Sequence, residues 1–521
     1  MSKSRRRLAP LVWLVALGAC NSIVGIEDLH EGPRPGTQNE GGDGTGATNS
    51  TGGKSNVAGD DNPGGTTPVT GGEPSSNAGT GNEGLVGGQG GSGTESPIGG
   101  AGGANNPVLS PVHGHVIDFW GKPIPDLPVQ IGEVLTSTDA KGEFTVADVP
   151  ATYDVSMVLN HSTAFGDQSD AWVYLGLSRR DPTLQMFWGG DQNYGYAAYT
   201  FNPKPTKLST QTIWVGFGGP DGNYNHDNVD ATGTTGSEVD WYGPTTTKDT
   251  LHALQWTKDG NDLPTAYSFY GTASINLSQS DTNTSVNVPF TKGTLDVATM
   301  TGTATSVGAG TRSNQVYLGF ADSARIKLLD YDGPKAALDA FSYKVPTGIV
   351  GGDLTVAAIQ GYQYSGFQVA HADALAADAK PALQIPPLVV QLTPAAGAKN
   401  VDQTTKFTVK DPGGAPGPYV AMFYSQDAPS GDPQAYQTIF IVTAKPSFTI
   451  PTIIGGGFAM YPGNDYLWSI GTFGAYASVD AMVSPGGFID EFALDETRAY
   501  GPRRVSGQYS NSATRKFTTK P

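Results

Sequence analysis

The chain contains one cysteine, Cys20, among its 521 residues. No disulfide can therefore form within the chain, and no CxxC motif is present. The folded part must gain its stability from packed apolar cores. Because Cys20 lies close to the start of the chain, no thiol nucleophile remains for the long segment that follows it.

Charged residues are also scarce, and the basic ones most of all. They make up 15% of the chain, with 31 Lys and Arg against 48 Asp and Glu, and the net charge is −17. A nucleic-acid partner is excluded, since phosphates require clustered basic side chains. Peripheral adsorption to anionic lipid is disfavoured for the same reason. The HExxH and GxSxG motifs are missing as well, so no catalytic motif identifies an enzyme.

The first twenty residues have the order of an export signal. Three arginines, Arg5 to Arg7, precede an apolar run from Leu8 to Ala19, and Cys20 follows. A bilayer-spanning helix needs about 20 apolar residues, so we interpret this shorter run as a removable signal. An ordinary secretory signal, followed by an incidental cysteine, is one alternative for this segment.

The motif Leu17-Gly18-Ala19-Cys20 resembles the lipobox of bacterial lipoproteins. That resemblance implies that Cys20 is lipidated on its thiol, becomes the mature N-terminus and anchors the protein to a membrane. Acyl chains contribute about 0.8 kcal/mol per buried CH₂. Asn21 stands where Asp would imply retention at the inner membrane, so the resemblance favours the outer membrane of the cell envelope.

Residues 31–106 are rich in glycine and poor in apolar side chains. They hold 25 Gly, eight acidic and two basic residues, and no Phe, Trp or Tyr. Such a segment buries too little apolar surface to offset its conformational entropy, so we predict a disordered linker. A Gly-rich coil of this length spans roughly 50 Å r.m.s., which suits a tether. The GxGxxG match at 88–93 lacks the flanking strand and helix and is interpreted as chance.

Folded structure is predicted to begin with residues 107–160. This segment resembles the carboxypeptidase regulatory-like module, a small transthyretin-like β-sandwich. The residues that carry the resemblance are Gly114-x-Val116, Gly121-x-Pro123, Thr138-Asp139-x-x-Gly142-x-Phe144, and Val149-Pro150 before Tyr153. The resemblance implies a scaffold without catalytic residues. His113 and His115 share one side of a strand, and we interpret them as surface histidines because no third metal ligand is evident.

Residues 161–386 are predicted to be β-rich, with one helix around Ala370 to Ala379. Three similar segments, Val173–Leu177, Ile213–Phe217 and Val316–Phe320, recur at unequal separations and therefore indicate similar central strands and not a solenoid. Glycine within each indicates a bulge or a close backbone approach. The expected strands are Ala171–Leu177, Thr212–Phe217, Thr265–Tyr270, Ser274–Leu277, Thr284–Phe290, Gln315–Phe320, Arg325–Leu329 and Thr355–Ile359.

Two groups of residues in this region are candidate binding sites. Exposed aromatic rings on a β-sandwich stack on sugars, whereas buried ones only pack the core, and both alternatives stay open. An oxygen-rich segment fits either a calcium site or an Asx-rich turn. The aromatic candidates are Trp172, Trp188, Trp214, Trp241 and Trp256, and the calcium candidates are Asp221, Asn223, Asn225 and Asp227. No other cofactor is expected.

Residues 387–521 resemble a fibronectin type III or related Ig-like domain. The residues that carry the resemblance are Leu392-x-Pro394, Phe407-x-Val409, Pro462-Gly463-x-x-Tyr466-x-Trp468-x-Ile470, and Phe517. Alternation places Tyr466, Trp468 and Ile470 on one face of a strand, so Trp468 is predicted to lie in the core of a sandwich.

Together these observations predict a mainly β protein with tandem β-sandwich domains after a disordered Gly-rich linker. The expected segments are a signal peptide (1–19), a lipidated N-terminus and linker (20–106), the regulatory-like sandwich (107–160), a β-rich central region (161–386) and the terminal sandwich (387–521). The expected function is a membrane-anchored, non-catalytic role in binding a glycan or envelope protein, or in structure. The alternative is a polysaccharide hydrolase that uses acids such as Asp181, Glu238, Asp240 and Asp259.

Overall fold

The computed structural model describes residues 109–521. The segments it leaves out within that range are 119–121, 164–165, 187–192, 203–207, 219–223, 229–236, 244–245, 279–284, 290, 307–311, 322–323, 333–337, 363–365, 411–416, 426–435, 456–457 and 486–506. The predicted signal segment with Cys20 and the predicted linker lie outside the described residues. Within them, no helix is both long enough and apolar enough to cross a bilayer.

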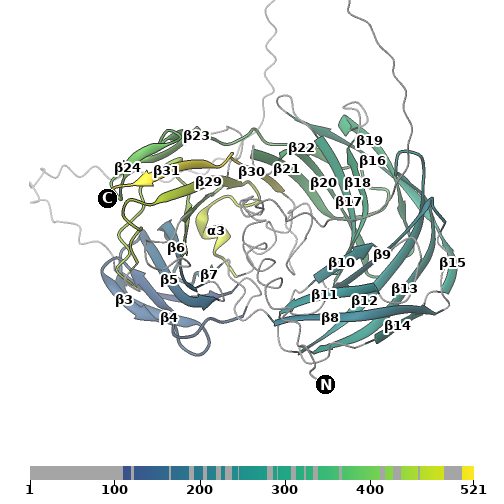
Figure 1. The fold of residues 1–521 in the computed structure, drawn as a ribbon, viewed down its shortest axis with the longest axis horizontal. Helices are drawn as coiled ribbons and strands as arrows, with labels where there is room; N and C mark the ends of the chain where they lie inside the picture. Colours follow the sequence, from purple (N-terminus) through teal and green to yellow (C-terminus); the bar gives the residue numbers. More distant parts are fainter. Residues whose placement is uncertain are drawn as a thin grey trace, which may run out of the picture. The chain divides into compact units, whose positions relative to one another are not determined.

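The described residues form strands arranged in six sheets, and the prediction of a mainly β fold is confirmed. The largest of these sheets has 14 strands (Figure 1). Its order is β18 (Arg325–Asp332), β17 (Arg312–Phe320), β20 (Gly352–Tyr362), β21 (Gly366–Leu375), β30 (Gly507–Asn511), β29 (Asp465–Phe473), β26 (Tyr419–Ser425), β27 (Tyr436–Thr443), β6 (Gly166–Leu177), β5 (Tyr153–Thr163), β2 (Pro128–Ile131) and β3 (Val134–Ser137). Off this path, β31 (Arg515–Thr519) pairs with β29 and with β24 (Ala398–Val401).

Five smaller sheets complete the described fold. Their orders are β4 (Glu143–Val149)–β1 (Ser110–Ile117)–β7 (Thr183–Gln185); β10 (Tyr224–Asn228)–β9 (Gln211–Gly218)–β12 (Thr246–Lys258)–β13 (Pro264–Ser278)–β15 (Thr291–Leu295); β11 (Ser237–Gly243)–β8 (Asn193–Asn202)–β14 (Ser285–Pro289); β19 (Ala340–Pro346)–β16 (Val297–Thr305)–β22 (Ala382–Gln384); and β23 (Val390–Thr393)–β25 (Phe407–Lys410)–β28 (Ser447–Phe448). A short helix, α3 (Val479–Met482), follows β29.

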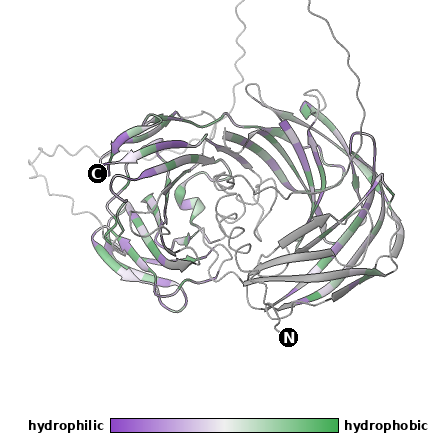
Figure 2. Ribbon diagram, in the orientation of Figure 1, coloured by the Kyte–Doolittle hydropathy of each residue, from purple (hydrophilic) through white to green (hydrophobic). Residues whose placement is uncertain are grey.

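The middle strands of the large sheet are buried on both faces. In β6, Trp172 and Tyr174 enter one apolar core, whereas Ala171 and Val173 enter another. The strands β26 and β27 divide their residues between the same two cores. Burial on both faces explains why these strands are runs of apolar residues, while hydrophobic and hydrophilic residues interleave along other strands in Figure 2.

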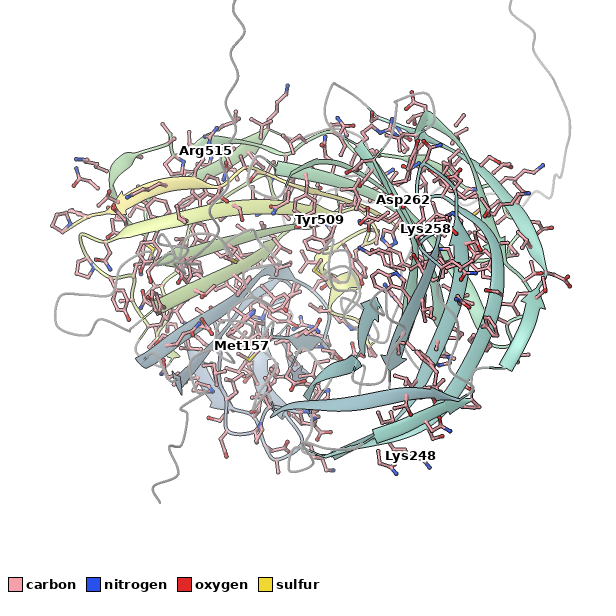
Figure 3. The ribbon with its side chains drawn as sticks, turned by 45° about the vertical axis from the view of Figure 1, so that its right-hand side comes forward. Met157, Lys248, Lys258, Asp262, Tyr509 and Arg515 are labelled. Carbon is pink, nitrogen blue, oxygen red and sulfur yellow. The ribbon has the colours of Figure 1, made fainter. Side chains whose placement is uncertain are left out.

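The core that contains Trp172, which we call the shared core, draws on all three predicted folded segments. Phe144 and Met157 come from residues 107–160, and Phe440 and Tyr509 come from residues 387–521. Met157 and Tyr509 are labelled in Figure 3. The β5–β6 hairpin crosses the boundary predicted at residue 160. Strands from different segments thus share backbone hydrogen bonds and one core, and the five-segment division itself stays a prediction.

The motif that links residues 107–160 to the regulatory-like module has a clear packing role. Gly114 faces the ring of Phe144, and a Cβ at this position would overlap that ring. Asp139 Oδ1 accepts hydrogen bonds from the backbone N–H groups of Lys141 (2.8 Å) and Glu143 (2.9 Å), which closes the turn before β4. Gly142 follows with φ +74°. The turn thus requires Asp139 and Gly142, and the close approach of two strands requires Gly114.

The helix expected over 370–379 is wrong, because β21 occupies Gly366–Leu375. This strand lies between β20 and β30 and pairs with both. Alanine and leucine favour a helix locally, but that preference is small beside hydrogen bonding along both edges of a strand. The expected strands Thr265–Tyr270 and Ser274–Leu277 are parts of the single strand β13.

The three similar segments are the strands β6, β9 and β17, and two of their glycines have the predicted kinds of role. Gly176 in β6 has φ +76°, close to the register shift between Tyr153 and Val155 in β5. Gly216 in β9 lies so close to β18 that a Cβ would overlap the carbonyl oxygen of Arg325.

Candidate functional site

Two of the five candidate tryptophans are core residues. Trp172 is 1% exposed and stacks on Phe440, with 5.5 Å between ring centroids. Trp256 is 2% exposed and lies beside Tyr267, with 6.2 Å between centroids. Rings buried in this way offer no face to a sugar, so these two follow the packing alternative. Aromatic side chains favour buried strand positions, which explains the outcome.

The other three tryptophans keep their binding role as a prediction. Trp214 is half-buried in β9, at the position that pairs with Leu254 of β12. Trp241 belongs to β11, but its side chain lies outside the described residues, as does all of Trp188.

The calcium candidates fall partly on a strand. Asn225 and Asp227 belong to β10, which pairs with β9, and their side chains lie outside the described residues. Asp221 and Asn223 lie outside the described residues. Among the side chains that the structure does describe, no group of three or more His, Cys, Asp or Glu is arranged to hold a metal ion. The calcium site stays a prediction.

A buried polar cluster that the sequence patterns do not predict lies on β20 and β21. Asp373 Oδ1 accepts a hydrogen bond of 2.8 Å from the Thr355 hydroxyl, and its Oδ2 lies 2.8 Å from Nδ1 of His371. A bulge puts an extra residue of β21 opposite Leu354 and Val356, and Ala374 within it has φ +53°. The bulge re-aims the side chains at the end of the strand.

The environment of Asp373 keeps its carboxylate charged. Burial alone raises the pKa of Asp373, but the contact with His371, the hydrogen bond from Thr355 and the nearby charge of buried Arg325 outweigh burial. Together they lower the pKa to about 2. A buried carboxylate that is paired and hydrogen-bonded in this way is a stable structural anion.

The order of groups in this cluster differs from that of a nucleophilic triad. A triad places the hydroxyl on the imidazole and the imidazole on the carboxylate, so that the imidazole removes the hydroxyl proton. Here the carboxylate of Asp373 lies between Thr355 and His371, and the hydroxyl donates to the carboxylate. The arrangement therefore orients side chains and does not activate Thr355.

The acids named for the hydrolase alternative have local partners where their side chains are described. Asp181 pairs with Arg179 at 2.9 Å. Asp259 Oδ1 accepts backbone hydrogen bonds from Asn261 (2.8 Å) and Leu263 (3.0 Å), which holds the turn between β12 and β13. The Lys258–Asp262 ion pair of 2.8 Å spans the same turn (Figure 3). Glu238 and Asp240 belong to β11, and their side chains lie outside the described residues.

Exposed apolar side chains lie at one end of the large sheet, on both of its faces. The strand β3 is the last in the strand order, and Val134 and Leu135 are 50% and 53% exposed. Ile454, on the neighbouring segment, is 60% exposed. Leu135 and the segment of Ile454 lie on one face of this edge and Val134 lies on the other, because consecutive strand residues point to opposite faces. We call these three residues the β3 shelf. Apolar side chains grouped at a sheet edge are typical of interaction surfaces.

The spacing of His371 and Asp373 in the sequence is the signal for the buried cluster. His371 and Asp373 are two residues apart, a spacing that places both on one face of a strand and on different faces of a helix. The helix predicted over 370–379 separates the two side chains, whereas the strand β21 brings them together. Thr355 and Arg325 come from other strands, and only the pairing of β20 with β21 shows that Thr355 is adjacent to the pair.

Comparison with known proteins gives distant structural likenesses only. No protein-family model matches the chain, and no curated protein matches its sequence. The structure is similar to the TIE protein of Bacillus anthracis (6% identity, 53% of this chain, 49% of that chain, TM-score 0.15). It is also similar to two B repeat units of the collagen-binding protein of Staphylococcus aureus (12% identity, 69% and 92% covered, TM-score 0.14).

A third likeness is to the full-length major pilin SpaD of Corynebacterium diphtheriae (6% identity, 49% and 87% covered, TM-score 0.12). The aligned part is about half the length of the TIE protein. At these TM-scores the likenesses carry no functional argument, and the mainly β fold rests on the strands of the chain itself.

Proposed function

We propose that this chain is a lipid-anchored protein of the bacterial outer membrane, held through Cys20, with a non-catalytic β-sheet body that binds a glycan or envelope protein or serves a structural role. The observation that carries the proposal is the order of its parts. A basic and apolar start ends at Leu17-Gly18-Ala19-Cys20, a Gly-rich segment of 76 residues at 31–106 follows, and a large β-sheet body comes last.

The contents of the body support the non-catalytic part of the proposal. In the buried cluster, the hydroxyl of Thr355 donates to the carboxylate of Asp373 and not to the imidazole of His371. The imidazole therefore does not act as a base toward Thr355. Asp181 and Asp259 are engaged in a surface ion pair and a turn. A body of this kind offers surfaces rather than a reaction centre.

The anchor is tested by replacing the one cysteine. The wild-type chain and Cys20→Ser are expressed in a Gram-negative host, and their membrane and soluble fractions are compared after detergent phase separation. We expect the wild type in the detergent phase with an acylated mature N-terminus by mass spectrometry, and Cys20→Ser in the aqueous phase. A Cys20→Ser chain that stays fully membrane-associated would contradict the proposal.

The proposed sorting to the outer membrane is tested by a substitution at Asn21, the residue after Cys20. Asn21→Asp keeps Cys20 and therefore keeps the acyl chains, but we expect this variant to move to the inner membrane on density-gradient separation. Equal outer-membrane recovery of the two chains would argue against sorting by residue 21.

The binding part is tested with the soluble mature Cys20→Ser chain on a glycan array. Trp214→Ala is the informative variant because Trp214 is half-buried, whereas Trp172→Ala would disturb the core. A glycan signal that Trp214→Ala removes would support sugar stacking. No glycan signal would favour a protein partner or a structural role.

A further inference from the structure

The two ends of the large sheet are built differently. At one end, β18 carries the exposed acids Asp330 and Asp332, and Lys327 Nζ lies 3.2 Å from Asp330 Oδ2. Charges of this kind protect an edge strand against pairing with another strand. At the other end, β3 has the sequence Val-Leu-Thr-Ser and no charged residue. Among the described strands it pairs only with β2, so its outer edge is open in this part of the chain.

The β3 shelf is held in place by hydrogen bonds below it. Gln130, which pairs with Leu135 across β2 and β3, accepts through Oε1 from the N–H groups of Ile454 (2.7 Å) and Gly455 (3.2 Å). A Cβ at Gly455 would lie 3.1 Å from Leu135 Cδ1. Leu135 and the segment that carries Ile454 are therefore in contact, and they form an apolar surface that needs no rearrangement to receive a partner.

We propose that residues 22–26 of this same chain, Ser-Ile-Val-Gly-Ile, add to the outer edge of β3 as an extra strand. This segment holds three β-branched aliphatic residues within four positions, whereas the 76 residues of 31–106 hold only four in all. In an extended strand Val24 and Ile26 share one face. That face meets Leu135 and Ile454, while Ile23 lies on the face of Val134. Main-chain hydrogen bonds to the open edge supply the remaining affinity.

Tethering favours this segment over a second copy of the chain. A segment joined by a coil with an r.m.s. span of roughly 50 Å has an effective concentration on the order of 1 mM. A second copy at micromolar concentration is about a thousandfold more dilute. Each copy also carries a net charge of −17, which opposes self-association. A strand edge of four residues binds any partner weakly. Only the tethered segment reaches a local concentration high enough to occupy it.

The test uses disulfide trapping, which the single native cysteine makes clean. In the soluble mature chain with Cys20→Ser, the substitution Ser137→Cys marks β3, and Ser22→Cys or Asp28→Cys marks one end of the segment. All three replaced residues lie outside the apolar contact. The control pair joins Ser137→Cys to Ser92→Cys in the linker, where the shorter coil to the folded body alone favours closure by about tenfold.

Docking predicts that a pair with Ser22→Cys or Asp28→Cys forms the monomeric disulfide faster than the Ser92→Cys pair. The additional change Val24→Asp should then restore the order that chain length sets. Faster closure of the Ser92→Cys pair overturns the proposal. Disulfide-linked dimers that dominate and increase with protein concentration also overturn it, and they would assign the edge to a second copy. The result does not depend on lipidation, so it is separate from the test of the anchor.

Discussion

At the scale of single residues, the buried charged side chains of this protein depend on their ion-pair and hydrogen-bond partners. Arg312 is buried, forms an ion pair with Asp339 and donates to the carbonyl oxygen of Ala304 at 2.9 Å. His371 and Asp373 form a second buried pair. A buried charge without a partner costs several kcal/mol, so removal of one member is more disruptive than the pair is stabilising.

Asp373 makes the stability of the protein depend on pH in a defined direction. Its pKa is about 2 in the folded chain, against about 3.9 in the unfolded chain. A lowered pKa stabilises the fold above the unfolded value, and this stability is lost as the pH falls from about 4 to about 2. The contribution is on the order of 2 kcal/mol.

The variant Asp373→Asn removes this titration. We expect it to unfold at lower urea concentration than the wild type at pH 7, and the difference in unfolding free energy between the two chains should shrink between pH 4 and pH 2. Urea denaturation at several pH values measures this difference directly. A difference that stays constant across this range would show that Asp373 does not carry the effect.

At the scale of elements, close backbone approach decides which strands meet. Gly216 of β9 faces the carbonyl oxygen of Arg325 at the start of β18, and His252 of β12 stacks on Phe320 of β17 with 3.8 Å between ring centroids. The five-stranded sheet therefore contacts β17 and β18 of the large sheet, and Tyr270 of β13 also stacks on Phe320, with 6.2 Å between ring centroids.

Gly216→Ala should consequently be strongly destabilising, because its Cβ meets backbone that cannot rotate away. We expect a loss of at least about 2 kcal/mol, at the upper part of the range for overpacked sites. Gly260→Ala is the matched control, since a Cβ there meets nothing within 4 Å. Thermal unfolding of both variants measures the effect, and equal midpoints would show that β9 and β18 move apart at no cost.

At the scale of the whole molecule, the sheet order links strands that are far apart in sequence. β6 pairs in parallel with β27, and β21 pairs with β30. Near α3, Asp480 Oδ1 accepts hydrogen bonds from the backbone N–H groups of Ser178 (2.9 Å) and Arg179 (3.0 Å). Such long-range pairing couples the segments, because separating the middle strands of the sheet would expose the shared core.

Cooperative unfolding of residues 109–521 follows from this coupling. Far-UV circular dichroism and tryptophan fluorescence should report one coincident transition in urea. Phe440→Ala, which removes the ring stacked on Trp172, should move that transition as a whole by about 3–5 kcal/mol. Val350→Ala, at an exposed residue, should leave it in place. Two separate transitions would indicate independently folding segments.

Much of the local structure was readable from the sequence. Alternation places Tyr466, Trp468 and Ile470 on one face of β29, and all three are buried in one core, as predicted. Turn residues such as Asp139 and Gly142 are where the motif requires them. These features depend on neighbours within a few residues, so a period of two and turn chemistry are sufficient to predict them.

The sequence by itself determined the mainly β character, the turns and the faces of individual strands, because side-chain alternation is a local property. Only the tertiary structure decided that residues 366–375 form a strand, that Thr355 lies beside the His371–Asp373 pair, and that β3 is the last of the described strands in the large sheet. Each of these depends on which strand lies alongside which, and pairing between distant segments leaves no periodic signal in either of them.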